Sequence, residues 1–406
     1  MPTYAFSGGD DSTPGWGQRN RVRFVGTWAV GDSWSINLVT NTEGDITLGE
    51  GNLEGAAYNY ALVHADRVYI ANGSFWSFSA ILDPTGWEQQ NVGAGFQKFT
   101  TSYGTGDSAI SLAVTQGRVA VFGRRNIQIW NVDANPASFS RAQVIQNAGT
   151  TAAESVQSIG ELDVLYLDDT GVRSLRTKET TLNAYVDDVG SAIDATLQGV
   201  FSELSVGQVE TCVSIVEPES KRYWLYVPNK TGILGGTIYV LSKFPSSKIQ
   251  AWSTYIPGMR CDRFMLYNNQ VLIKGRATGT SNNARLYLYG GLDGVTYDTS
   301  IPTVDLPWID LQTPGKVKQA CGLQAAFKGN WQIYASMNPT AGSMVEVVNR
   351  GSAVTPNSLA DSTYDIGHFN YQASGNHIHL KAVGVAAAEA QTLSMLTLQY
   401  NEAHER

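Results

Sequence analysis

The chain has 406 residues, of which 43% are hydrophobic, 16% are charged and 41 are glycine, and its net charge is −8. A chain of this length and apolar content is globular rather than disordered, and it exceeds one ordinary core unless the fold is a large closed ring or two domains. The acidic balance lacks the clustered Lys and Arg of a tight nucleic-acid binder, although an acidic wall would let duplex DNA slide past.

Targeting signals and cysteines suggest the compartment. The first twenty residues, MPTYAFSGGDDSTPGWGQRN, hold no apolar core flanked by positive charge, so we expect no signal peptide. No run of about 18 apolar residues occurs, so we expect no membrane-spanning segment. Cys212, Cys261 and Cys321 show no C-x-x-C spacing, which favours buried free thiols over a metal site or disulfides. We therefore expect a chain made and folded in cytosol.

One pattern recurs five times along the chain: polar or turn-type residues, then Arg, Asp or Gln, then an apolar run. The copies are HADRVYIANG, TQGRVAVFGR, GELDVLYLDD, ESKRYWLYVP and YNNQVLIKGR. Their spacings are 51, 45, 59 and 48 residues, measured between the first apolar residues Val68, Val119, Val164, Tyr223 and Val271. A period near 50 is typical of propeller blades.

The apolar runs also have the composition of strands packed on both faces. RVAVF, DVLYL and YWLYV are apolar without interruption, whereas a strand with one face in water alternates. Turn signals precede them at Gln116-Gly117, Gly160-Glu161 and Asn268-Asn269, and further strands recur as NIQIWNV, GTIYVLSK and ARLYLYGG. We predict an all-β fold, a β-propeller-like ring of repeated antiparallel blades with the five strands innermost or second. The alternative is an irregular pair of β-sandwiches with coincidental spacing.

Two features depart from the repeat. Val186, Val189, Ile193 and Leu197 follow helical spacing behind a possible cap at Asn183, which predicts a short helical insertion near 184–200. From about residue 301 the strands lose the repeat signature. We therefore predict a propeller-like domain over 1–300 and a small C-terminal β-sandwich over 301–406, which could lend its last strand, LSMLTLQYN, to the ring.

Several motifs invite a chemical interpretation. GDSW at Gly31–Trp34 and GDSA at Gly106–Ala109 are not G-x-S-x-G elbows, and the contiguous SGNH at Ser374–His377 does not match a hydrolase signature whose residues come from separate blocks. His377 and His379 share a strand face with Lys381, and His368 is nearby in sequence; this favours a solvated face over a metal site.

The paired acids do not fit a calcium-binding loop either; they are Asp10-Asp11, Asp168-Asp169 and Asp187-Asp188. No phosphate-binding glycine loop occurs. We predict no catalytic, cofactor-binding or metal-binding residue, no cofactor and no enzymatic activity.

Over about residues 113–200 the order of motifs resembles the packaged-DNA stabilisation proteins, or tail nozzles, of short-tailed bacteriophages. The likeness comprises a strand ending at Trp130-Asn131, a loop, Phe139-x-Arg141, Gly149 with AAESV, and the strand pair LDVLYLDDTGVRSLRT followed by a short helix. Where the family more often has Phe-Pro-Phe before the Arg, this chain has NPASFSR. The segment PWIDLQTPGKVKQACGLQ also resembles the closing domain of such proteins.

The resemblance implies a structural protein of the virion tail. It implies a homo-oligomeric ring of six copies below the portal and adaptor, which continues the DNA channel, helps retain packaged DNA and conducts it during ejection. The implied partners are the head-to-tail adaptor, a tail fibre, spike or needle, and double-stranded DNA as passing cargo. We further expect the loop Asn131–Phe139 near a subunit or adaptor contact, because Phe139 beside Arg141 is a pairing enriched at interfaces.

The alternative is a receptor- or glycan-binding propeller, with or without sugar-cleaving activity. Its support is the set of Trp- and Tyr-rich loops, such as GSFWSFSAILDPTGW at 73–87. Such aromatics are more often core or subunit interface, and sugar cleavage would need two carboxylates a few Å apart.

Overall fold

In the computed structural model the described residues are 60–87, 93–99, 107–160, 163–178, 183–230, 235–244, 249–277, 284–291, 301–311, 313, 315–340, 344–350, 365–385 and 391–402. The chain divides into two compact units, Met1–Leu288 and Tyr289–Arg406. The division follows the last strand of the repeat, whereas the boundary predicted from sequence was after residue 300. No helix among the described residues is long and apolar enough to cross a bilayer.

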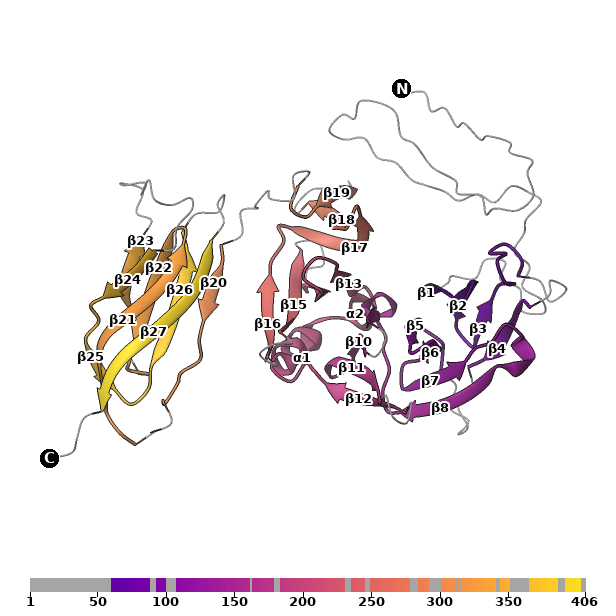
Figure 1. Ribbon diagram of the computed structural model, residues 1–406, viewed down its shortest axis with the longest axis horizontal. Helices are drawn as coiled ribbons and strands as arrows, with labels where there is room; N and C mark the ends of the chain where they lie inside the picture. The colour runs from indigo at the N-terminus through magenta and orange to yellow at the C-terminus, as the bar shows by residue number, and fades with distance from the viewer. Residues whose placement is uncertain are drawn as a thin grey trace, which may run out of the picture. The chain divides into compact units, whose positions relative to one another are not determined.

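The described part of the first unit forms five antiparallel sheets, which we call blades 1 to 5 (Figure 1). Blade 1 holds β1 (Tyr60–His64), β2 (Arg67–Asn72), β3 (Phe75–Phe78) and β4 (Gly95–Lys98). Blade 2 holds β5 (Ser111–Thr115), β6 (Arg118–Phe122), β7 (Asn126–Asn131) and β8 (Ser140–Gln146). Blade 3 holds β9 (Gln157–Ile159), β10 (Asp163–Asp168), β11 (Gly171–Thr177) and β12 (Ala184–Asp188).

Blade 4 holds β13 (Val213–Glu217), β14 (Arg222–Pro228), β15 (Gly236–Phe244) and β16 (Ile249–Tyr255), and blade 5 holds β17 (Met259–Tyr267), β18 (Gln270–Ala277) and β19 (Ala284–Leu288). In every blade the strands pair in chain order. β5, β13 and β17 lie toward the centre, and β4, β8, β12 and β16 lie at the outer edge (Figure 1). This confirms the propeller-like arrangement, and the five repeated stretches are the second strands β2, β6, β10, β14 and β18.

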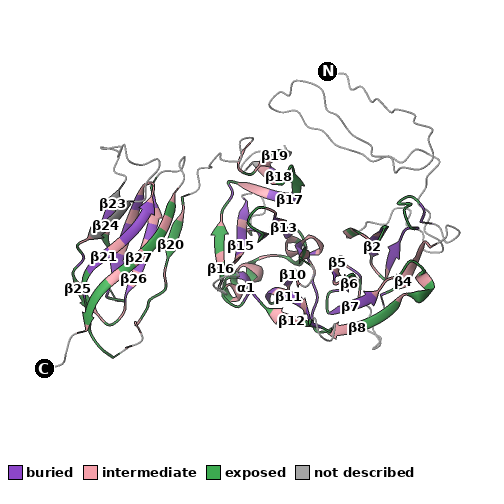
Figure 2. Cartoon of the chain, in the orientation of Figure 1, coloured by how far each residue is buried: buried purple, intermediate pink, exposed green. Residues whose placement is uncertain are grey.

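Hydrophobic layers between consecutive blades explain the uninterrupted apolar runs. Val119, Val164 and Tyr223 are fully buried, and the second strands of blades 2 to 4 are buried on both faces (Figure 2). Separate clusters join blades 1 and 2, 2 and 3, 3 and 4, and 4 and 5. Three of these layers contain aromatic pairs across the blades, with ring centroids 5.3 Å apart for Trp76–Trp130, 5.1 Å for Phe122–Tyr166 and 6.4 Å for Trp224–Phe264.

The turns that enter the second strands of blades 1, 2 and 5 are two-residue hairpins. Both central residues have positive φ at Ala65-Asp66, at Gln116-Gly117 and at Asn268-Asn269, which is the type I′ geometry that matches strand twist. Gly160 also has a positive φ of 64°, while its predicted partner Glu161 lies outside the described residues. Two of the three turn signals in the sequence, Gln116-Gly117 and Asn268-Asn269, therefore correspond to this hairpin geometry.

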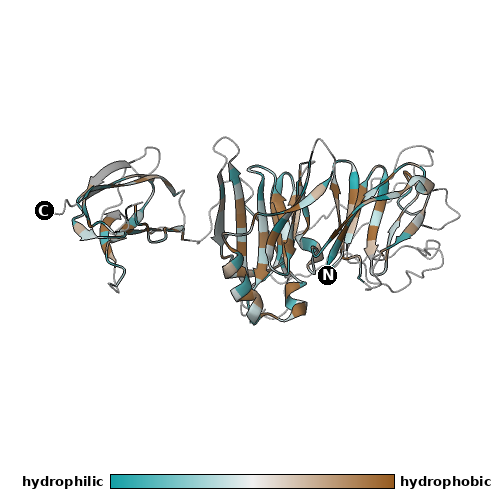
Figure 3. Ribbon diagram, turned by 90° about the horizontal axis from the view of Figure 1, so that it is seen from below, coloured by the Kyte–Doolittle hydropathy of each residue, from teal (hydrophilic) through white to brown (hydrophobic). Residues whose placement is uncertain are grey.

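The helical insertion exists, but it starts later than predicted. Ala184–Asp188 is the strand β12, in which Val186 pairs with Leu175 and Asp187 with Ser174. The helix α1 spans Asp194–Glu203, and its N-cap residue is Ile193, not Asn183. Pairing with β11 outweighs the helical spacing of the apolar residues here. A second helix, α2 (Val206–Val209), follows, and Figure 3 shows the two helices together on one side of the strands.

The second unit is a β-sandwich. One sheet has the order β20-β26-β22-β23, and in the other β21 pairs with β24, β25 and β27. The strands are β20 (Thr303–Asp305), β21 (Lys318–Lys328), β22 (Trp331–Ser336), β23 (Val345–Arg350), β24 (Asp365–Phe369), β25 (Ala373–Gly375), β26 (His379–Gly384) and β27 (Thr392–Glu402). One core lies between the sheets and includes Leu323, Trp331 and Ile333.

The last strand stays in the sandwich. β27 pairs along β21, with Leu398 opposite Leu323, so the suggestion that it completes the propeller ring was wrong. Leu396 and Leu398 pack on the sandwich core, but Tyr400, two residues further along the strand, is 36% exposed. The bulge between Ala320 and Gly322 lies opposite this end of the strand.

Candidate functional site

The loop Asn131–Phe139, which joins β7 to β8, is held by a buried arginine of blade 1. Arg67 is 2% exposed and donates hydrogen bonds to the carbonyl oxygens of Ser79 (2.7 Å), Ala134 (2.6 Å) and Gly93. Within the loop lies the 3-10 helix η1 (Pro136–Ser138). Because a buried guanidinium needs its donors satisfied, these carbonyls fix the loop of blade 2 against blade 1.

Phe139 reinforces that contact and is less exposed than the sequence suggested. Its ring centroid is 4.8 Å from that of Phe78, and it stacks on Trp76 at 6.2 Å with an interplanar angle of 5°. The guanidinium of Arg67 lies 6.0 Å from the Phe139 ring centroid. Phe139 therefore joins two blades, and the exposed side chains of the loop are its polar and small ones: Asp133, Ala134, Asn135, Ala137 and Ser138.

The AAESV stretch lies where the first strands of several blades meet. It contains the 3-10 helix η2 (Ala153–Ser155). Ser111 of blade 2 donates to the Ala153 carbonyl at 2.8 Å, and Ser214 of blade 4 donates to the Glu154 carbonyl at 2.9 Å. Tyr223, also of blade 4, donates to the Ser155 carbonyl at 2.8 Å. The segment thus acts as a hub that ties neighbouring blades together.

The hub also carries charge. The Glu154 carboxylate forms an ion pair of 2.7 Å with Arg263 of blade 5. Burial raises the pKa of Tyr60 in blade 1, and the negative charge of Glu154 raises it further. Two acids on first strands have local partners. Glu217 accepts hydrogen bonds from the backbone N–H groups of Glu219 and Ser220, and Asp262 pairs with two arginines of blade 5. Among the described residues, these first-strand carboxylates all have structural partners.

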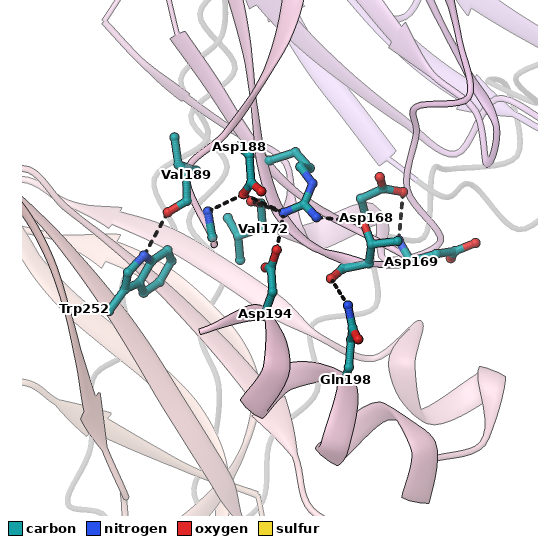
Figure 4. Close-up of polar contacts among 11 residues, drawn as sticks. Asp168, Asp169, Val172, Asp188, Val189, Asp194, Gln198 and Trp252 are labelled. Atoms are coloured by element: carbon teal, nitrogen blue, oxygen red, sulfur yellow. Dashed lines mark hydrogen bonds and ion pairs between the residues drawn. The ribbon is translucent and has the colours of Figure 1, made fainter. Parts of the chain in front are cut away.

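A second charged cluster holds helix α1 on blade 3, and we call it the Arg173 cluster. Arg173 Nη1 lies 2.9 Å from both Asp188 and Asp194, and Nη2 donates to Thr170 at 2.8 Å. Figure 4 shows Asp188 and Asp194 approaching one guanidinium. A Cβ built on Gly171 would overlap Asp194 Oδ1, and Gly171 has a φ of +149°. Gly171 thus leaves room for Asp194, the first residue of helix α1, and Arg173 neutralises the charge of that carboxylate.

Asp168, the neighbour of this cluster, has an unusual environment. Burial raises its pKa, and the nearby charges of Asp169 and Asp194 raise it further. The backbone N–H of Asp169, which donates to Asp168 at 2.7 Å, and Arg173 act in the opposite direction. A raised carboxyl pKa is also what a general acid needs. Here, however, Arg173 pairs with the adjacent carboxylates Asp188 and Asp194. This pairing favours a role of the acidic residues in attaching helix α1 to blade 3.

The serine motifs do not assemble a nucleophile site among the described residues. Asp107 of GDSA accepts hydrogen bonds from the backbone N–H groups of Arg124 and Arg125, at 3.0 and 2.9 Å, and from the Asn126 side chain. It therefore shapes the turn before β7. GDSW at Gly31–Trp34 and the acids Asp10-Asp11 lie outside the described residues.

The alternate histidines of the second unit follow the predicted pattern of a solvated face over a buried one. Ile378 and Leu380 are buried in the sandwich core, whereas His379 and Lys381 face outward and both contact Asp305, at 2.6 and 3.3 Å. The described residues contain no group of three or more potential metal ligands. His368 lies in β24, where its side chain is outside the described atoms.

Two other expectations are answered by burial. In the aromatic segment 73–87, Trp76, Phe78 and Trp87 are buried core residues, so they are not available to a sugar. Cys212 and Cys261 are buried free thiols, as expected, but Cys321 is exposed because it lies at the bulge in β21.

Three features were missed from sequence: the buried Arg67, the hub position of Glu154, and an exposed Trp308 above His379, with ring centroids 5.0 Å apart. Arg67 begins a repeated strand, as the half-buried Arg118 does, so its residue type and position in the repeat did not predict that it is buried. The Trp in DLPWID was visible, but its place beside His379 depends on the bridge between Ile309 and Ile378.

No family model and no curated protein matches the chain. A glycoside hydrolase family 43 arabinoxylan arabinofuranohydrolase from Bacillus subtilis, solved in complex with cellotetraose, is similar over 88% of this chain and 98% of that chain, at 11% identity and a TM-score of 0.27. The extracellular domain of a one-component system from B. thetaiotaomicron is similar over 82% of this chain and 58% of that chain, at 9% identity and a TM-score of 0.29. Similarity this low supports no inference about activity or ligand.

Proposed function

We propose that the protein is a structural component of a short-tailed bacteriophage virion, a tail nozzle or hub. In this role six copies form a ring below the portal and adaptor. The ring continues the DNA channel, helps to retain packaged DNA and conducts it during ejection. Its partners are the adaptor, a tail fibre, spike or needle protein, and double-stranded DNA as passing cargo.

The observation that supports this proposal is how charged side chains in the resembling segment, or in contact with it, are used. Arg67 holds the loop after Trp130, Glu154 joins blades at the hub, and Arg173 fixes helix α1. Each is committed to holding the fold together, and no catalytic role is needed to account for it. Such contacts between blades, loop and helix suit a component that must keep its fold under the pressure of packaged DNA.

The exposed part of the loop Asn131–Phe139 is the surface we assign to assembly. Phe139 is packed between blades, so the contact would be made by the residues around η1. Ala137 is exposed and its side chain is small. A large charged side chain at this position would block close approach of a neighbouring subunit without disturbing the intrachain contacts of Arg67 and Phe139.

The test compares Ala137→Arg with Ala195→Arg, a change at an exposed position of helix α1. Both variants should melt as the unaltered chain does. We expect Ala137→Arg to abolish ring formation in mass photometry and electron microscopy, while Ala195→Arg assembles. If Ala137→Arg forms rings at the same protein concentrations as the unaltered chain, the assignment of the loop to assembly is overturned. Phe139→Ala is less informative, because it should lower the stability of the isolated chain.

A sugar-cleaving propeller is the weaker alternative. Cleavage needs an acid and a base or nucleophile facing a shared space, and the described carboxylates of the hub and of the first strands are held by arginines or by backbone N–H groups. Assays for release of reducing sugar from arabinoxylan, with Glu154→Gln as the matched variant, would separate the two. Turnover that is lost in Glu154→Gln, while the melting temperature of that variant stays unchanged, would favour the enzyme.

A further inference from the structure

We infer that the outer face of the sheet β20-β26-β22-β23 in the second unit binds a neutral saccharide. This inference goes beyond the proposed structural role and does not depend on it. Throughout, "the outer face" means the surface formed by Asp305, Trp308, Gln332, Tyr334, His379 and Lys381.

The outer face is defined by strand register. Asp305 of β20 is opposite Lys381 of β26, Lys381 is opposite Tyr334 of β22, and Tyr334 is opposite Glu346 of β23. The alternating residues of β26 and β22, including Leu380, Ala382 and Ile333, point into the core. Because neighbouring strands are about 4.8 Å apart, this row crosses roughly 14 Å of sheet, enough for a short oligosaccharide.

An aromatic platform lies at one end of the row. Trp308 is 38% exposed, and its ring leans on His379 with centroids 5.0 Å apart and an interplanar angle of 47°. The His379 ring is in turn held by Asp305 at 2.6 Å. An exposed indole fixed from below offers an apolar surface on which the C–H face of a sugar ring can stack, since aromatic rings supply large contact area with little loss of side-chain freedom.

The polar groups around the platform suit hydroxyls. Lys381 Nζ lies 3.3 Å from Asp305, and Tyr334 donates to the Gln332 side-chain oxygen at 3.0 Å. This places a carboxylate, an ammonium, an amide and a phenol side by side, which together can donate to and accept from sugar hydroxyls. The hydrogen bond from His379 and the charge of Lys381 hold the pKa of Asp305 below its usual value, so this acceptor is ionised at neutral pH.

The charge of the outer face selects among ligands. Asp305 lies beside Lys381 and His379, and Glu346 borders the face next to Tyr334, so the face presents no basic patch that would attract a polyanion. An apolar partner surface is equally unsuited, because the polar side chains would lose water without matching partners. A neutral, hydroxyl-rich ligand matches both the aromatic platform and the balanced charge.

The experiment uses the full chain on a printed array of plant and bacterial glycans, followed by affinity gel electrophoresis in arabinoxylan, mannan, dextran and heparin. We expect binding to at least one neutral glycan. Trp308→Ala should weaken it about tenfold or more, and Gln332→Ala should weaken it while leaving the platform intact. The matched control is Tyr400→Ala, which removes an exposed aromatic ring from the other sheet of the same unit.

Thermal melting of each variant separates loss of binding from loss of folding. If Trp308→Ala does not fold, Gln332→Ala still tests the binding site. Binding to no neutral glycan, retardation by heparin alone, or equal weakening by Tyr400→Ala would overturn the inference. So would a change in the oligomeric state of Trp308→Ala, which would identify the face as a contact between copies. None of these outcomes depends on ring assembly through the loop Asn131–Phe139.

Discussion

Arg67 in blade 1 donates a hydrogen bond of 2.6 Å to the carbonyl oxygen of Ala134 in blade 2, a residue 67 positions further along the chain. The bond joins the first residue of one repeated strand to the loop that follows the third strand of the next blade. Apolar layers also join the blades, as between Phe122 and Tyr166. Here a buried cation also fixes the loop to which we assign assembly.

Replacing Arg67 by Met should destabilise the chain strongly. The substitution keeps an apolar stem but removes the donors to three carbonyl oxygens, and an unsatisfied buried polar group costs about 1–3 kcal/mol. We expect the free energy of unfolding, measured in urea, to fall by at least about 3 kcal/mol. Arg118→Met, at the half-buried equivalent position of blade 2, is the control. An equal loss of unfolding free energy in the two variants would contradict the specific role of Arg67 in holding the loop of blade 2.

Two glycines near helix α1 should respond in opposite directions. Gly171→Ala places a Cβ over Asp194 Oδ1 at a φ of +149°, so we expect a loss of about 2–4 kcal/mol. Gly199→Ala lies inside α1 with open space around it, so we expect a gain of up to about 1 kcal/mol from helix propensity. Chemical denaturation of both variants checks the pair, and a tolerated Gly171→Ala would refute the close packing of the Arg173 cluster.

Asp168 and Asp83 should give opposite pH dependences. The pKa of Asp168 is raised in the folded chain, so the folded state binds the proton more tightly, and stability falls as pH rises from the unfolded value near 3.9 through the folded value. Asp168→Asn should therefore be more stable than the unaltered chain at pH 7, and the difference should vanish toward pH 3.

The pKa of Asp83 is lowered, chiefly by the hydrogen bond from the Thr85 side chain. Its ionised form stabilises the fold above the unfolded pKa, and this contribution disappears as pH falls through the folded value. Asp83→Asn should thus be the less stable variant at pH 7. Thermal melting from pH 3 to pH 7 tests both, and a stabilising effect of Asp168→Asn that persists unchanged at pH 3 would contradict the assignment.

Leu165→Asp should prevent folding. Leu165 is fully buried in the layer between blades 3 and 4, and a buried unpaired carboxylate costs several kcal/mol. We expect insoluble or unfolded protein by circular dichroism, whereas Leu165→Met should remain folded. A soluble Leu165→Asp chain that melts cooperatively would count against the layered packing of the blades.

The free protein should not retain duplex DNA at physiological salt. The chain carries 36 acids against 28 bases, and near a channel wall only charges within a Debye length of about 8 Å act on the DNA. In the proposed role, retention of the genome would then come from closure of the ring and not from adhesion to its wall. Filter binding with submicromolar affinity and a steep salt slope would reveal a concentrated basic surface and refute this prediction.

The propeller-like architecture could be predicted because each blade repeats one local rule. Val119 and Val164 belong to runs that are apolar on both faces, and Gln116-Gly117 is a hairpin signal that needs no tertiary information. The helix was predicted to begin too early because Val186 and Val189 fit a helical period, although Val186 also fits the outer strand β12. Pairing with β11, which depends on distant residues, decided between them.

The candidate sites were less predictable, since they depend on where a residue lies and not on its type. Phe139 beside Arg141 had the composition of an exposed anchor, yet contacts with Phe78 and Trp76 bury much of it. Glu154 sits in an unremarkable AAESV stretch and becomes a hub residue only when five blades are arranged around it. Register across β20, β26 and β22 likewise creates the outer face, which no single segment encodes.

The most direct test of the central claim is native mass spectrometry of the full chain over about a hundredfold range of concentration. The proposed nozzle role predicts a discrete closed assembly of six copies, or of a multiple of six, that electron microscopy resolves as a ring. A chain that stays monomeric throughout this range, and remains so when mixed with the portal and adaptor proteins of its own virion, would contradict the proposal.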